Sequence, residues 1–307
     1  MISAPVLFVV FRRPDTTRMV FEAIRAAKPT RLYVAADGPR VHRLGEKALC
    51  DEVREIATAV DWECEVRTLF RETNLGCREA VSTALDWFFE SEKEGIVLED
   101  DCLPDQSFFR FCEELLERYR HDRRIMVIAG NHFHGSAHKP THSYFFSRYN
   151  HCWGWASWRR AWREYDREMS QWPSLKSTDW LMRIGDGHRD FREYWQRVFD
   201  TAYAGEIDTW DYMWTFSCWT QNGLTVLPSR NLVKNVGFGK DSSHTGSDGG
   251  WISRLPLESI SFPLDHPSDI VRDRVADRWT DLNYFGTRAP LYKRIIRGIL
   301  GLRWGRL

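Results

Sequence analysis

The sequence has neither a net charge nor a regular cysteine pattern. Its 43 Lys and Arg residues balance 43 Asp and Glu residues, so the chain has no general attraction to nucleic acid or to acidic partners. The seven cysteines are scattered and form no CxxC pair. They predict free thiols in a reducing compartment instead of a disulfide framework or a zinc site. Four histidines in the loop 131–143 are weak evidence for zinc, because no acidic helix lies near them in the sequence.

Long apolar segments are also missing. The first apolar run, residues 6–11, is too short for a signal peptide and follows no basic region. No stretch approaches the roughly 18 to 20 apolar residues of a transmembrane helix. With 307 residues, 43% of them hydrophobic, the chain can build one large domain or two small ones. We expect a globular protein of the cytosol.

The two common glycine-rich phosphate-binding loops are absent as well. No GxGxxG follows the first predicted strand and no GxxxxGK[ST] occurs anywhere, which disfavours dinucleotide-binding and P-loop proteins. Apolar and alternating runs predict strands at residues 6–11, 32–36, 65–70, 96–98, 125–130 and 224–228. Helical patterns lie between most of these strands. This alternation predicts an α/β fold with a parallel sheet and right-handed crossovers.

The most informative stretch is a buried strand that ends in three acidic residues. The apolar run 96–98 is followed directly by Glu99, Asp100 and Asp101. Carboxylates at this end of a strand lie where open α/β sheets bind ligands, and three crowded charges repel one another unless a cation or donors stabilise them. We therefore predict a divalent-metal site that holds a phosphate-bearing substrate. The alternative is an acidic turn that caps the helix 107–120.

Two further carboxylates stand at the ends of predicted elements. Asp37 follows the strand 32–36 in an Asp-Gly-Pro turn. Asp208 is a plausible cap for another helix, which would place Asp211 in its first turn, near the positive end of the helix dipole.

Tryptophan is abundant and unevenly distributed. Ten of the fifteen tryptophans lie between residues 149 and 220. Large aromatic faces beside polar groups suit stacking on a sugar ring or a base. The alternative is a tryptophan-rich core, since Trp155, Trp158 and Trp162 also lie at helical spacing.

Two late segments are candidates for binding roles. The polar, glycine-containing stretch 236–246 could fold over a bound nucleotide as a lid. Residues 290–307 combine one apolar helical face with five basic residues. That pattern is typical of an interfacial helix on an anionic membrane, which would place the protein peripherally on the inner face. The alternative is a terminal helix docked on the domain.

Several stretches, in matching order, resemble a GT-A-fold glycosyltransferase. The likeness is greatest to the N-acetylglucosaminyltransferase I family and its bacterial relatives. The stretches are Ala36-Asp37-Gly38, Val97-Leu98-Glu99-Asp100-Asp101, Trp153-Gly154-Trp155, Trp210-Asp211-Tyr212-Met213 and Gly239-Lys240-Asp241-Ser242-Ser243-His244. They are similar, respectively, to the family's nucleoside-binding Asp, its EDD motif, its acceptor-side Gly-Trp segment, its WDxWM segment and its loop over the diphosphate. Tyr212 stands where the family has a second Asp.

The resemblance implies a fold and a division of the chain. The fold would be of the GT-A type, which is Rossmann-like, with a mostly parallel central sheet and helices on both faces. Residues 1–255 would form the GT-A domain, with a nucleotide-sugar-binding half at 1–130 and an acceptor half with a flexible loop at 131–255. Residues 256–307 would be a C-terminal extension that carries the basic amphipathic helix.

The resemblance also implies roles for individual residues. Asp211 would be the catalytic base, and Asp101 and His244 would bind Mn²⁺ or Mg²⁺. Donor binding would fall to Arg12, Asp37, Arg78, Glu99, Asp100 and Lys240. Acceptor binding would fall to Trp153, Trp155 and Trp210.

The activity so implied is metal-dependent, inverting transfer of a sugar. The donor would be a nucleotide-diphosphate sugar, most simply a UDP-sugar carrying GlcNAc or a related hexose, and the acceptor a hydroxyl of a glycan or lipid-linked glycoconjugate. Three other classes stay open: a glycoside hydrolase, a sugar-nucleotide nucleotidyltransferase and a non-catalytic carbohydrate-binding protein. A hydrolase needs two carboxyls that flank one bond at about 5 to 9.5 Å. A nucleotidyltransferase should carry a glycine-rich loop where this chain has Arg12-Arg13-Pro14.

Overall fold

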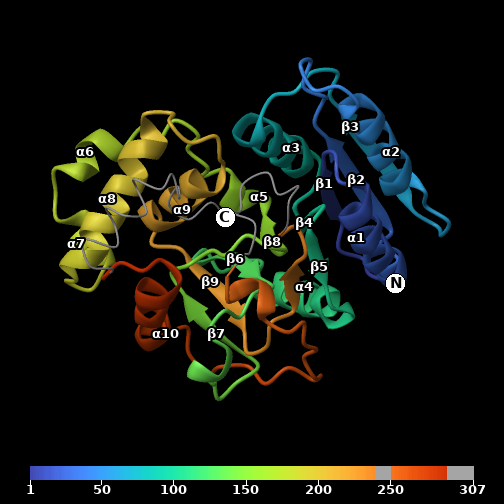
Figure 1. Cartoon of the computed structure of the whole chain (residues 1–307). Helices are drawn as coiled ribbons and strands as arrows, with labels where there is room; N and C mark the ends of the chain where they lie inside the picture. Colours follow the sequence, from blue (N-terminus) through green and yellow to red (C-terminus); the bar gives the residue numbers. More distant parts are fainter. Residues whose placement is uncertain (239–249, 289–307) are drawn as a thin grey trace.

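The centre of the molecule is an eight-stranded sheet with helices on both faces (Figure 1). The computed structural model describes residues 1–238 and 250–288. In the order in which they lie, the strands are β3 (Glu65–Phe70), β2 (Arg31–Ala36), β1 (Val6–Val10), β4 (Glu94–Glu99), β8 (Trp155–Trp158), β6 (Ile125–Ala129), β9 (Leu224–Pro228) and β7 (Tyr144–Ser147). Four of the seven neighbouring pairs are parallel, and the three antiparallel pairs all involve β7 or β8. The predicted α/β class with a mostly parallel sheet is confirmed.

Two groups of helices cover the sheet. One group connects the strands of the N-terminal half, and the other follows β8 and forms a largely helical layer. The first comprises α1 (Pro14–Ala27), α2 (Glu46–Thr58), α3 (Cys77–Ser91) and α4 (Gln106–Tyr119). The second comprises α5 (Arg159–Trp162), α6 (Trp172–Lys176), α7 (Trp180–Ile184), α8 (Arg189–Tyr203) and α9 (Asp211–Thr220). A short two-stranded sheet pairs β5 (Cys102–Pro104) with β10 (Val233–Asn235).

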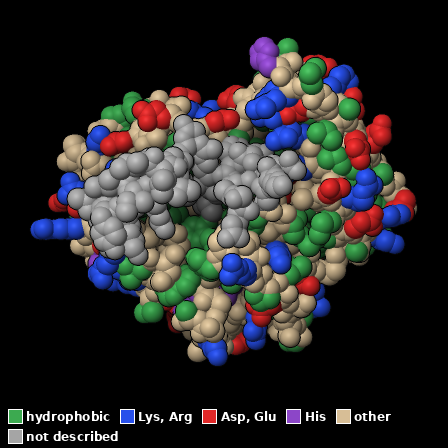
Figure 2. All heavy atoms as spheres, viewed as in Figure 1, with side chains coloured by type: hydrophobic (Ala, Val, Ile, Leu, Met, Phe, Trp, Pro, Cys, Tyr) green, Lys and Arg blue, Asp and Glu red, His purple; other side chains and the backbone are tan. Residues whose placement is uncertain are grey.

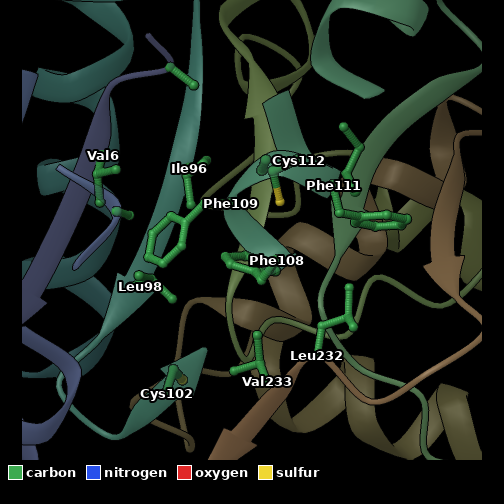
Figure 3. Close-up of a cluster of buried hydrophobic side chains, with 14 of the residues drawn as sticks. Val6, Ile96, Leu98, Cys102, Phe108, Phe109, Phe111, Cys112, Leu232 and Val233 are labelled. Atoms are coloured by element: carbon green, nitrogen blue, oxygen red, sulfur yellow. The ribbon is translucent and has the colours of Figure 1, made fainter. Parts of the chain in front are cut away.

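The two faces of the sheet build two separate hydrophobic cores, because successive side chains of a strand point to opposite faces. In β1, Val6 and Phe8 belong to the core under α1, α2 and α4, whereas Leu7 belongs to the core under α3 and α8. Figure 3 shows part of the first core, where Phe108 and Phe109 of α4 pack near the strand residues. Burial on both faces explains why these strands read as continuous apolar runs.

The helix that the spacing of Trp155, Trp158 and Trp162 suggested is not present as one element. Residues Trp155 to Trp158 form the strand β8, which lies antiparallel between β4 and β6, although their spacing also fitted a helix. Within residues 153–162, only Arg159–Trp162 is helical. The short strands β5, β7 and β10 were not expected either. All of these strands depend on partners that are remote in the sequence.

Strand register brings the predicted site residues to one edge. Val10 of β1 lies opposite Ala36 of β2, and Val9 lies opposite Glu99 of β4. The residues that follow these parallel strands therefore emerge side by side. They are the 11–13 segment, Asp37 and the Asp100–Asp101 pair.

The described C-terminal part packs back on the sheet. Ile260 and Leu264 are buried in the first core, and Asp273 of segment 256–288 is the N-cap of α10 (Arg274–Trp279). No helix among residues 1–238 and 250–288 is long and apolar enough to cross a membrane. Residues 239–246 of the predicted lid and the whole of the predicted basic tail lie outside the described residues. On the face in Figure 2, acidic and basic side chains are intermixed, in keeping with the zero net charge.

Candidate functional site

A cavity of about 600 Å³ opens where β1, β2 and β4 end. Its floor contains the last residues of β1 and β2, and one wall is formed by the start of α3. Five arginines line it: Arg12, Arg13, Arg40, Arg43 and Arg71. Five carboxylic acids also line it: Asp37, Glu46, Glu99, Asp100 and Asp208. The cavity therefore lies where open α/β sheets place their ligands and has cationic groups that suit phosphate.

Arg13 holds the two aspartates that follow β4. Its Nη2 atom lies 2.5 Å from Asp100 Oδ1 and its Nη1 atom 3.0 Å from Asp101 Oδ2. The backbone N–H of Phe11 donates a further hydrogen bond of 3.1 Å to Asp100 Oδ2. Burial raises the pKa of Asp100 to about 6, although Arg13 acts in the opposite direction. Arg13 was not among the predicted site residues, and its position between the end of β1 and Pro14 was the available signal.

Glu99 has a different electrostatic environment from its two neighbours. Burial, together with the charges of Asp101 and Asp100, raises the pKa of Glu99 to about 8. At neutral pH its carboxyl group is therefore mostly protonated and can donate a hydrogen bond into the cavity. The acidic triplet thus contains two arginine-bound aspartates and one neutral acid.

Asp37 joins the end of β2 to the turn before α3. Its carboxylate accepts hydrogen bonds from the backbone N–H groups of Gly38 (2.8 Å) and Leu75 (3.0 Å) and from Asn74 Nδ2 (2.7 Å). Burial raises its pKa, and these donors oppose that effect. A Cβ at Gly38 would overlap the backbone of Thr73, so the Asp-Gly pair fits a close approach of two chain segments.

Asp208 caps a different helix from the one expected. Its two carboxylate oxygens accept hydrogen bonds of 2.9 Å from the backbone N–H groups of Cys77 and Arg78, at the beginning of α3. The helix that was expected to begin at Asp208 begins at Asp211. Asp208 therefore links the loop before α9 to the wall of the large cavity.

Asp211 lies within electrostatic range of Glu99, although 112 residues separate the two in the sequence. It is 8% exposed and accepts a hydrogen bond from the Thr209 hydroxyl. Its charge is among the causes that raise the pKa of Glu99 and of the Cys77 thiol, after desolvation itself. The predicted base and the predicted donor-binding residues thus meet at one place in the fold.

A second, much smaller cavity adjoins Asp211. Its volume is about 20 Å³, and its walls include His151, Cys152, Trp153, Trp195, Tyr284 and Phe285. Cys152 of this cavity interacts electrostatically with Asp211 and with Glu99 of the large cavity. Both carboxyl groups raise the pKa of the Cys152 thiol, after burial itself. The two cavities therefore flank the same group of carboxylates.

Arg78 is a predicted donor-binding residue that does not line the large cavity. The guanidinium of Arg78 donates 2.7 Å to the carbonyl of Arg167 and lies 3.3 Å from Glu168, so its side chain does not face the site as predicted. Arg12 does line the cavity, where its Nε atom lies 3.4 Å from Glu46.

The predicted acceptor-binding tryptophans are largely core residues. Trp155 is 1% exposed and Trp210 is 2% exposed, and their rings stack 5.6 Å apart. Neither offers a free face for a sugar, which corrects the stacking interpretation for these two residues. Trp153 is 7% exposed and lines the small cavity, packed against Phe133 and Phe238.

The described residues do not by themselves fit a divalent metal. Among residues 1–238 and 250–288, no group of three or more His, Cys, Asp or Glu side chains is placed to hold a metal ion. The predicted ligand Asp101 is bound to Arg13, and a Cβ at Gly237 would overlap both of these side chains. The other predicted ligand, His244, and the predicted donor-binding Lys240 lie outside the described residues. The Mn²⁺ or Mg²⁺ site stays a prediction.

Comparisons with known proteins give only remote likenesses. No protein-family model and none of the curated proteins matches the sequence. Mouse xyloside xylosyltransferase 1, in its apo form, is similar at 9% identity over 70% of this chain and 81% of that chain, with a TM-score of 0.32. UDP-glucose pyrophosphorylase complexed with UDP-glucose is similar at 11% identity over 41% of this chain, with a TM-score of 0.26. The match spans 56% of the pyrophosphorylase. Likenesses this remote carry no argument about function, which therefore rests on the site.

Proposed function

We propose that this protein is a glycosyltransferase that moves a sugar from a nucleotide-diphosphate donor, a UDP-hexose such as UDP-GlcNAc, to a hydroxyl of a glycan or lipid-linked acceptor. The observation that carries the proposal is the electrostatic interaction of Asp211 with Glu99, which ends β4 beside an arginine-lined cavity. A group that can accept a proton thus lies next to groups that can hold a charged donor. The motif resemblance supports the same function independently of the geometry.

The large cavity suits the donor. Its volume of about 600 Å³ falls within the roughly 300 to 1,000 Å³ of small-molecule sites. Arginine binds phosphate oxygens through two parallel hydrogen bonds. Because Arg13 is already bound to Asp100 and Asp101, Arg12 and Arg43 are the candidates for the diphosphate. Protonated Glu99 could donate a hydrogen bond to a sugar or phosphate oxygen.

The chemical step follows from the positions of these groups. Negative charge builds on the diphosphate as the bond to the sugar breaks, and fixed guanidinium groups offset that charge without having to reorganise. Asp211 would take the proton of the attacking hydroxyl. A single displacement of this kind inverts the anomeric centre. Positioned proton transfer typically contributes about 10²- to 10⁴-fold to the rate.

The proposal is tested by Asp211→Asn. This change keeps the size of the side chain but removes the basic carboxylate, so we expect sugar transfer to fall by about 10²- to 10⁴-fold. Donor affinity should stay near that of the wild type, because the donor cavity is not lined by Asp211. Transfer is measured with a panel of nucleotide sugars and acceptors, and donor affinity by calorimetry with and without Mn²⁺.

Asp51→Asn is a matched control. Asp51 pairs with Lys47 on the surface of α2, at 2.6 Å, and this variant should transfer sugar at the wild-type rate. Transfer by Asp211→Asn at the wild-type rate would show that the base assignment is wrong. Donor binding that is the same with and without Mn²⁺ would argue against the predicted metal site.

A further inference from the structure

The small cavity beside Asp211 has the size of one water molecule. Its volume is about 20 Å³, and a cavity needs about 10 to 15 Å³ to hold one water, with two to four polar partners. Part of its lining comes from the segment 149–153 that leads into β8, and another part from Tyr284 and Phe285 near the C-terminal end of the described chain. The cavity is therefore assembled from parts of the chain that only the tertiary fold brings together.

Two residues that line the cavity each have a side-chain nitrogen that is buried without a hydrogen-bond partner. The two atoms are His151 Nε2 and Trp195 Nε1. His151 is 7% exposed and Trp195 is 1% exposed, so bulk water does not satisfy them. A buried donor or acceptor without a partner is unfavourable, because it has given up its hydrogen bonds to water. Two such atoms on residues that line one water-sized cavity indicate that a polar ligand atom completes the site.

The surroundings fix the direction of the His151 ring. Its centroid lies 4.5 Å from that of Phe133, 5.3 Å from Tyr284 and 6.1 Å from Tyr149. Burial lowers the pKa of His151 to about 3. The imidazole therefore stays neutral at physiological pH and does not compete with Asp211 for a proton.

Another polar pair in the walls is already satisfied. The Thr215 hydroxyl donates a hydrogen bond of 2.7 Å to Asn150 Oδ1. These two side chains bond to each other and give no hydrogen bond to His151 Nε2 or Trp195 Nε1. The partner that the cavity lacks has to reach His151 Nε2 and Trp195 Nε1 while lying next to Asp211.

We propose that this cavity is a subsite for one hydroxyl oxygen, held by His151 Nε2 and Trp195 Nε1 beside Asp211. During transfer the oxygen is the attacking hydroxyl of the acceptor, and without an acceptor it is a single water. The inference rests on the proposed function. It makes His151 and Trp195 positioning residues, because they orient the nucleophile and take no part in bond breaking.

The assignment accounts for each bond and proton. The oxygen accepts hydrogen bonds from the Trp195 N–H and from the Nε2–H of the neutral His151 ring. Its own proton passes to the Asp211 carboxylate, which leaves an electron pair on the oxygen for the new bond. A bond forms between this oxygen and the anomeric carbon, while the bond from that carbon to the diphosphate breaks and leaves its electron pair on phosphate. If water occupies the subsite, the products are free sugar and the nucleoside diphosphate. A slow donor hydrolysis without acceptor is therefore a second activity of the same subsite.

Three variants test the subsite. His151→Phe and Trp195→Phe each remove one polar nitrogen and keep an aromatic ring, so we expect kcat for transfer and for donor hydrolysis to fall at least about tenfold, with donor KM within about twofold. His151→Gln restores a polar atom and should recover part of kcat. Trp214→Phe is the matched control, since Trp214 Nε1 is also buried without a partner but does not line this cavity. This control should keep the wild-type kcat.

A crystal structure without acceptor supplies a readout that does not depend on activity. We expect one ordered water within hydrogen-bond distance of both nitrogens, and no such water in His151→Phe. An empty cavity in the wild type, or wild-type kinetics in both phenylalanine variants, would overturn the subsite. An ordered water in a protein that neither transfers nor hydrolyses any nucleotide sugar would refute the proposed function and the acceptor assignment, but not the oxygen site itself.

Discussion

At the scale of single residues, the donor side of the site depends on one guanidinium. Arg13 contacts both Asp100 and Asp101, and the side chain of Asp100 is 4% exposed. A buried carboxylate that loses its partner is far more costly than the pair itself is favourable. Arg13 therefore stabilises the folded state and neutralises the two carboxylates beside the cavity.

Arg13→Ala should lower the free energy of unfolding by about 3 to 5 kcal/mol, since it leaves Asp100 without its cation. Urea denaturation at neutral pH measures the change. Arg18→Ala is the control, because Arg18 and Glu52 form an exposed pair at 3.4 Å with more than half of the Arg18 side chain accessible. The control should change stability by less than about 0.5 kcal/mol. Equal losses in the two variants would contradict the role given to Arg13.

At the scale of elements, a buried ion pair holds the C-terminal segment on the domain. Arg148, just after β7, donates hydrogen bonds of 2.8 Å from Nη2 to both carboxylate oxygens of Asp281. Ser147 Oγ donates one of 2.5 Å to Asp277 of α10, and Tyr149 donates to Asp281. This network positions the turn that ends in Tyr284, whose ring stacks on Phe133 with centroids 4.9 Å apart. The wall of the small cavity therefore depends on a contact formed more than 130 residues along the chain.

Asp281→Ala should release this segment, because the only ion pairs left to Arg148 within the described residues would be the longer ones to Asp186 at 3.5 Å and Asp277 at 4.0 Å. We expect a loss of about 3 to 5 kcal/mol in the free energy of unfolding. Hydrogen exchange should become faster over residues 273–288. Glu258→Ala removes the partner of the surface residue Arg230 and should leave exchange in 273–288 unchanged. Unchanged protection in Asp281→Ala would show that other contacts dock the segment.

At the scale of the whole molecule, the net charge is zero, but buried acids and buried histidines have pKa values shifted in opposite directions. Burial raises the pKa of Asp100 and Glu99 and lowers that of His134 to about 4 and that of His151 to about 3. Above about pH 6.5, a histidine whose folded pKa lies below its unfolded value of about 6.5 is neutral in both states and does not lower the free energy of unfolding. As the pH falls below about 6.5, the unfolded state binds more protons and stability is lost.

The response of His151 can be isolated by comparison with His151→Phe. Between pH 7 and pH 4.5 the free energy of unfolding of the wild type should fall relative to the variant by about 2 to 3 kcal/mol, because only the wild-type unfolded chain gains a proton at this position. Urea denaturation at both pH values measures the difference. Parallel pH curves for the two proteins would mean that His151 is solvated in the folded state.

Part of the fold and of the site was already determined by local sequence. The strands at 65–70 and 224–228 were predicted with the bounds that the structure has, and β1, β2, β4 and β6 within two residues. Hydrophobic runs and helical spacing are properties of neighbouring residues, so they can be read without knowing the partner strands. The position of Asp37 and of the acidic triplet at strand ends followed for the same reason.

The tertiary structure decided everything that depends on distant partners. The strand β8 exists because its backbone pairs with both β4 and β6, and its burial turned Trp155 into a core residue. The bond from Arg13 to Asp101, the approach of Asp211 to Glu99, and the small cavity between segment 149–153 and Tyr284 likewise join remote parts of the chain. Local sequence determines which residues can form strands and carry charge. Strand pairing and the packing of two cores determine which of those charges meet.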